Sequence, residues 1–126
     1  MASLDHIILK VNNLNTSVAF YTQVLGFTLE GTDGPFTLIR AGADCQLQLA
    51  PWGTPGLEHY AFAVSRVEFE EIFGRIKAMG IAYGPTFSSV GANTGPGREA
   101  GARGAAPTIY FNDPNLHLLE IRSYES

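Results

Sequence analysis

The chain has 126 residues, of which 45% are hydrophobic and 16% charged, with a formal net charge of −4. This length and composition predict one folded domain with a real hydrophobic core. The absence of a basic run argues against nucleic acid as a partner, and no apolar run reaches the ~20 residues of a membrane-spanning helix. A lone cysteine, Cys45, and a strand pattern that leaves no room for a signal peptide favour a cytoplasmic location.

Hydrophobic periodicity indicates a single domain, residues 1–126, built from two similar modules at about 4–50 and 57–123. In chain order, the first module is predicted to contain a strand at 4–11, a helix at 16–25 capped by Asn15, and strands at 27–31, 36–41 and 45–50. The second is predicted to contain a strand at 59–64, a helix at 67–79, and strands at 82–87, 108–112 and 116–121. Each module is therefore βαβββ, and the fold class is α+β, a curved mixed sheet.

Residues 88–107 form the least regular and most glycine-rich segment of the chain. A structureless stretch of this length in a compact domain is usually a functional lid, with disorder as the alternative. Arg98 and Arg103 lie in it and are candidates to clamp an anionic substrate. Exposed charges without a role are the other interpretation.

The same short string occurs in both modules, and each copy carries a histidine. Leu4-Asp5-His6 and Leu57-Glu58-His59 each open a strand that leads into a helix. A duplicated unit should place His6 and His59 at equivalent positions, where they meet in space. With Glu120 near the end of the chain they form a two-histidine, one-carboxylate set, which binds Fe(II) and also accepts Mn, Ni, Co or Zn. The pattern predicts a divalent metal site.

Strand alternation assigns these residues to faces. His59 shares a face with Ala61 and Ala63, which leaves open space beside the imidazole, whereas the bulky Tyr60 and Phe62 face a helix. A carboxylate flanked by leucines, as Glu120 is, is costly to bury unless a cation compensates its charge.

Four further residues have weaker signals. The pseudo-twofold relation matches Glu120 with Gln48 in the fourth strand, as a weak metal ligand or a polar surface residue. Tyr110 is a candidate to supply a catalytic phenol, its alternative being a half-buried sheet aromatic. Arg122 shares the face of Glu120 and is expected to steady it or to contact the substrate. His117 points to the opposite face and is expected to be structural.

Three segments carry a family resemblance: Leu4-Asp5-His6 with Phe20-Tyr21 and Leu25-Gly26-Phe27; Glu58-His59-Tyr60-Ala61-Phe62; and Tyr110-Phe111-Asn112-Asp113-Pro114 with His117, Leu119 and Glu120. Over nearly its whole length the chain resembles the vicinal oxygen chelate superfamily, which includes glyoxalase I, bleomycin-resistance proteins, extradiol dioxygenases and fosfomycin-modifying thiol transferases. The resemblance implies paired βαβββ modules around a divalent metal held by His6, His59 and Glu120, with Gln48 at the fourth-strand position often used. It also implies a homodimer.

The expected function is that of a metal-dependent enzyme of the glyoxalase type, an isomerase or lyase. The metal would bind two adjacent oxygens of a small substrate, and Glu120 would move a proton. The alternatives are a bleomycin-resistance-type binding protein, an Fe(II) dioxygenase and a metal-dependent thiol transferase. Two residues depart from the family pattern: Leu116 stands where the last hairpin usually has glycine, and Gln48 where glyoxalase I has glutamate.

Overall fold

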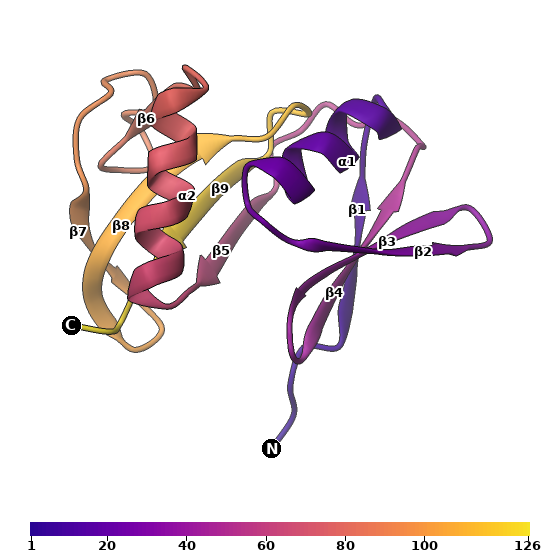
Figure 1. Cartoon of the computed structure of the whole chain (residues 1–126), viewed down its shortest axis with the longest axis horizontal. Helices are drawn as coiled ribbons and strands as arrows, with labels where there is room; N and C mark the ends of the chain where they lie inside the picture. Colours follow the sequence, from indigo (N-terminus) through magenta and orange to yellow (C-terminus); the bar gives the residue numbers. More distant parts are fainter. The chain divides into compact units, whose positions relative to one another are not determined.

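The computed structural model describes all 126 residues of the chain (Figure 1). The chain divides into two compact units, Met1–Pro55 and Gly56–Ser126, and each is described by itself. None of its helices has the length and apolar character that crossing a bilayer requires.

The first unit is a four-stranded sheet in the order β1-β4-β3-β2 with one helix. Its elements are β1 (His6–Lys10), α1 (Leu14–Gln23), β2 (Thr28–Asp33), β3 (Phe36–Gly42) and β4 (Cys45–Ala50). β1 runs parallel to β4, and the other neighbours are antiparallel. The predicted order of elements in this unit is confirmed.

The cap of α1 differs from the prediction by two residues. Asn13 has an extended backbone, and its side chain accepts a hydrogen bond from the Thr16 N–H at 2.9 Å. Asn15 lies inside the first helical turn and is not the cap. The correction follows from the helix beginning at Leu14, earlier than the apolar spacing indicated.

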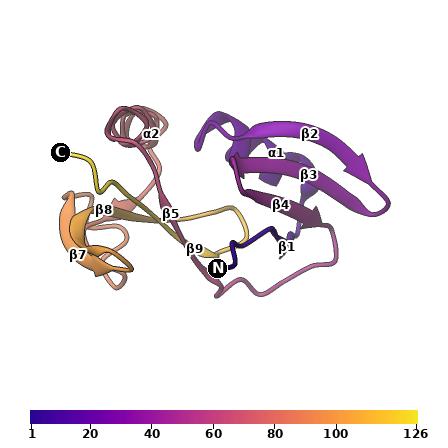
Figure 2. The same cartoon turned by 90° about the horizontal axis from the view of Figure 1, so that it is seen from below.

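The second unit is a five-stranded sheet in the order β5-β9-β8-β6, with β7 paired to β8. Its elements are β5 (His59–Ala63), α2 (Arg66–Ala78), β6 (Tyr83–Gly84), β7 (Gly97–Gly101), β8 (Gly104–Asn112) and β9 (Leu118–Arg122). Figure 2 looks along α2 and shows it on one side of this sheet. The helix buries the four apolar residues that its periodicity singles out: Phe69, Ile72, Phe73 and Ile76.

The second half of the predicted structureless segment is instead β-structure, whereas residues 88–96 are irregular. β7 and the start of β8 form an antiparallel hairpin, with Gly97 opposite Thr108 and Gly101 opposite Gly104. Two of its glycines have different reasons: a Cβ at Gly97 would collide with the carbonyl of Pro85, and Gly104 has a φ of 102°, which favours glycine. The second unit is therefore βαββββ, and its β6 strand has two residues in place of the predicted 82–87.

Candidate metal centre

The candidate site lies on one face of the second sheet. The register of β5, β9 and β8 aligns Ala61, Glu120 and Tyr110 across three neighbouring strands. His59 lies two positions before Ala61, so its side chain shares their face. The apolar residues between them, such as Leu119 and Ile121, point to the other face and are fully buried.

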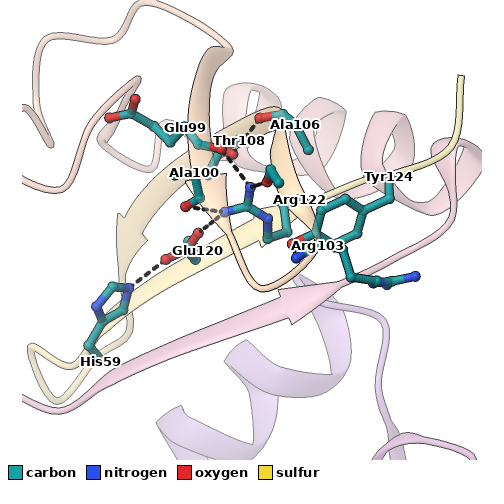
Figure 3. A network of polar contacts seen from close by, with 10 residues as sticks. His59, Glu99, Ala100, Arg103, Ala106, Thr108, Glu120, Arg122 and Tyr124 are labelled. Atoms are coloured by element: carbon teal, nitrogen blue, oxygen red, sulfur yellow. Dashed lines mark hydrogen bonds and ion pairs between the residues drawn. The ribbon is translucent and has the colours of Figure 1, made fainter.

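His59 and Glu120 face each other directly. His59 Nε2 lies 2.7 Å from Glu120 Oε1 (Figure 3). The Glu120 side chain is 6% exposed and the His59 side chain 47% exposed, so the pair joins a buried carboxylate to a half-exposed imidazole. Imidazole nitrogen and carboxylate oxygen are donor types that Zn, Ni, Co, Mn and Fe accept. The pair therefore fits two positions in the ligand set of a divalent metal.

Arg122 holds the second oxygen of that carboxylate. Its Nη1 donates to Glu120 Oε2 at 3.0 Å, and both side chains are buried. Its terminal nitrogens also donate to backbone carbonyls of the β7–β8 hairpin, at Glu99 (2.6 Å), Ala100 (3.2 Å) and Gly104 (3.2 Å). A Cβ at Gly101 would collide with this guanidinium, so the glycine makes room for it. Arg122 thereby fixes the orientation of Glu120.

This placement differs from the substrate contact suggested for Arg122. The residue is 4% exposed, and both terminal nitrogens already donate to Glu120 or to the hairpin. Its Nε is buried without a partner. The contacts of Arg122 agree with the other expectation, that it steadies Glu120.

Tyr110 lies next to the pair, with its ring centroid 6.1 Å from that of His59. It is 5% exposed. Burial raises the pKa of its phenol, and the negative charge of Glu120 raises that pKa further. The hydroxyl therefore stays protonated through neutral pH and is a potential hydrogen-bond donor beside the site.

This shift makes an alkaline titration informative. The folded-state pKa of Tyr110 lies above the ordinary value of 10.0, so the unfolded chain ionises first. The contribution of this phenol to the free energy of unfolding is complete below the unfolded-state pKa and is lost as pH rises through the folded-state pKa. We expect Tyr110→Phe to remove one late-titrating phenol from the tyrosinate absorbance curve and to lessen the alkaline loss of stability. Tyr60, whose pKa is also raised by burial, provides the control in Tyr60→Phe. A curve unchanged by Tyr110→Phe would contradict the assignment.

The remaining predicted ligands belong to the first unit. His6 lies at the start of β1, and its Nδ1 is 2.7 Å from Asp5 Oδ2, which leaves Nε2 for another partner. Gln48 is paired with Ile8, as Glu120 is paired with Ala61 in the second unit, so Gln48 holds the position equivalent to Glu120. Within either unit, no group of three His, Cys, Asp or Glu side chains converges. Each unit by itself thus supplies part of the predicted set.

A family model for the Glyoxalase/Bleomycin resistance protein/Dioxygenase superfamily matches residues 3–121. The chain belongs to this superfamily. It is 28% identical to the glutathione transferase FosA of Serratia marcescens, over 96% of this chain and 80% of that protein. It is 27% identical to the virulence protein STM3117 of Salmonella typhimurium, over 96% and 83%. The structure of the oxidase ChaP-H1 is 29% identical, with a TM-score of 0.76 over 98% of this chain and 96% of that one.

Arg98 and Arg103, the two loop arginines expected to bind the substrate, lie away from His59 and Glu120. Arg98 is paired with Pro107, one position from Thr108, so its side chain leaves the sheet on the face opposite Arg122. Arg103 stacks on the Tyr124 ring at 4.2 Å. Both arginines line a cavity of about 360 Å³ that His59 and Glu120 do not line. Their positions therefore do not support the expectation that these two arginines clamp a substrate at the metal centre.

A second cavity, of about 340 Å³, borders His59, where open space was expected, but its other lining residues were not predicted. Its wall includes Asn112 and Leu118, which the register aligns with His59. Strand alternation in the string Tyr110-Phe111-Asn112 could have identified Asn112, because it shares the face of Tyr110. The contributions of Phe87 and Ser88 carried no signal, since they come from an irregular loop.

Proposed function

We propose that the chain is a divalent-metal-dependent enzyme that binds a small substrate through two adjacent oxygens. The observation that carries the proposal is the 2.7 Å pair of His59 Nε2 and Glu120 Oε1, in which a buried carboxylate faces a half-exposed imidazole. His6 is the proposed third ligand, from the same chain or from a second copy in a homodimer. Gln48 is a weaker, neutral ligand or a polar contact. Membership in a superfamily whose name includes glyoxalases and dioxygenases supports this assignment.

When bound, a divalent cation (Ni, Zn, Mn, Co or Fe) supplies Lewis-acid polarisation of the substrate oxygens. The residues of the chain prepare the site for it. Arg122 keeps Glu120 in one orientation, which preorganises the carboxylate. The proposed role of the neutral phenol of Tyr110 is to donate a hydrogen bond to negative charge that develops on a substrate oxygen.

The reaction we propose is that of an isomerase or lyase, in which a proton leaves the carbon next to a carbonyl. Glu120 is the carboxylate nearest to this chemistry. Because Oε2 of Glu120 accepts a hydrogen bond from Arg122 at 3.0 Å, the oxygen that would take the proton is Oε1, and it would do so after releasing the metal. Arg122 would keep the carboxylate at the site during this change, because it holds the other oxygen.

Hydrogen exchange tests this reaction. Protein loaded with each metal in turn is incubated in heavy water with phenacyl alcohol or hydroxyacetone, and loss of the carbon-bound proton is followed by NMR. We expect exchange about 100-fold faster than with metal-free protein, within the range of general acid–base catalysis. The variant Glu120→Gln should lose this acceleration. Equal rates with and without metal would refute the isomerase or lyase proposal.

Thiol transfer is the second candidate, and the 28% identity to a glutathione transferase favours it. The same metal-loaded preparations, given glutathione and an epoxide, would then consume thiol without promoting hydrogen exchange. Oxygen uptake by the Fe(II)-loaded protein would instead indicate oxidative chemistry like that named for the oxidase ChaP-H1. Ligand binding that needs no metal would indicate a binding protein of the bleomycin-resistance type.

A further inference from the structure

The cavity of about 340 Å³ beside His59 is mostly apolar. Its apolar lining consists of Leu57, Phe87, Val90, Leu116 and Leu118. Ser88, Asn112 and Glu58 provide its polar atoms besides His59, and no lysine or arginine contributes to it. The volume is that of a site for a small organic group.

Two of these leucines occupy backbone conformations that disfavour them. Leu57 has a φ of 78° and Leu116 a φ of 67°, values at which glycine or asparagine is less strained. Both side chains are exposed, Leu57 by 83% and Leu116 by 64%, so little packing offsets this strain. Their backbones are joined, because the Leu57 N–H donates to the Leu116 carbonyl at 3.2 Å. An exposed leucine held in a strained conformation at a cavity mouth suggests a role for its side chain.

The loop that carries Phe87, another part of the lining, is also held in place by local contacts. A Cβ at Gly84 would collide with the backbone of Ser89, so the glycine lets the loop after β6 fold closely against that strand. Ser89 Oγ accepts a hydrogen bond from the Thr86 N–H at 3.0 Å and so closes the turn that carries Phe87. Phe87 is 67% exposed and lines the cavity. The loop thus brings Phe87 into the lining of the same cavity as Leu116.

We infer that this cavity receives the apolar, uncharged part of the substrate, and that Leu116 and Phe87 determine specificity for it. The inference rests on the proposed function, since His59 joins the cavity to the metal centre. The exposed carboxylate of Glu58 and the absence of a cation in the lining disfavour a negative charge on this part of the substrate. The substrate class is therefore a neutral compound that has two adjacent oxygens next to an aryl or branched alkyl group.

Calorimetry on the metal-loaded protein tests the inference with three probes. Phenacyl alcohol carries a phenyl group beside its two oxygens, hydroxyacetone a methyl group, and the para-carboxylate of phenacyl alcohol a charged ring. We expect phenacyl alcohol to bind at least about 10-fold more tightly than hydroxyacetone, as burial of a ring implies. The para-carboxylate should lose most of that advantage.

The variant Leu116→Gly separates function from folding. We expect it to raise the thermal unfolding midpoint, because glycine relieves the backbone strain, and to reduce the preference for phenacyl alcohol to below about 3-fold. Leu116→Asn should act in the same way, and hydroxyacetone affinity should not change. Val67→Ala, which removes an exposed apolar group from α2, is the control and should leave the preference intact.

Three results would overturn the inference: an unchanged preference in Leu116→Gly, tighter binding of the para-carboxylate, or dissociation of a dimer by Leu116→Gly, which would make the leucine a contact between copies. Metal binding by the unmodified chain is measured separately. If metal binds and the three probes bind equally, only the cavity inference fails. If no metal binds, the proposed function fails.

Discussion

Replacing His59 with alanine is expected to weaken the binding of a divalent metal by more than about 100-fold, the upper end of the loss seen when an outer-shell partner is removed. The fold should survive, because the side chain is 47% exposed and its hydrogen bond is to the side chain of Glu120. Titration calorimetry with Zn or Ni measures the affinity, and circular dichroism checks the fold.

His117 gives a matched control for this experiment. It is 1% exposed, and its Nδ1 accepts a hydrogen bond from the Glu58 N–H at 3.3 Å. His117→Gln should therefore lower stability and leave metal affinity unchanged. The account is contradicted if the two histidines exchange these effects, with His59→Ala unfolding the chain and His117→Gln losing the metal.

Replacing Arg122 with alanine is expected to destabilise the metal-free protein by about 3–5 kcal/mol, since one partner of a buried ion pair is left without the other. The carboxylate of Glu120 would remain buried, and three hairpin carbonyls would lose their donor. Urea unfolding at neutral pH measures the change in the free energy of unfolding.

A second change shows whether the buried charge is the cause. In the Arg122→Ala background, Glu120→Gln removes the uncompensated charge and should restore part of the stability that Arg122→Ala loses. Glu120→Gln alone should be destabilising, because it breaks the pair from the other side. A loss below about 1 kcal/mol in Arg122→Ala, typical of an exposed pair, would show that Arg122 does not hold Glu120 as described.

Strand alternation assigned His59 and Glu120 to faces of their strands, but their pairing also depends on which strands are neighbours. β5 and β9 are parallel neighbours, and Glu120 is aligned with Ala61, one row from His59. Small residues at 61 and 63 on the face of His59 were visible in the sequence, and so was the bulky face that α2 covers.

The relative positions of Arg98 and Arg122 could not be predicted, for a different reason. Glycine content made residues 88–107 look irregular, whereas Gly97 and Gly101 allow the β7–β8 hairpin to pack closely against its neighbours. Without that hairpin there was no register to show that Arg98 and Arg122 leave the sheet on opposite faces. The carbonyls that hold Arg122 come from the same hairpin, so its full role was equally hidden.

The unusual position of Leu116 could be predicted in part. Its departure from the family's glycine was visible, but the consequence needed the structure, which gives a φ of 67° together with an exposed side chain beside His59. Backbone strain and cavity lining depend on the fold around the turn, which residue identity alone does not specify.

A crystal structure of the metal-loaded protein tests the central claim most directly. The proposal predicts one divalent ion bound by His59 Nε2, Glu120 Oε1 and His6, with Arg122 still on Glu120 Oε2. The same structure would show whether His6 comes from the same chain or from a second copy. A metal bound elsewhere, with His59 and Glu120 still paired to each other at full metal occupancy, would contradict it.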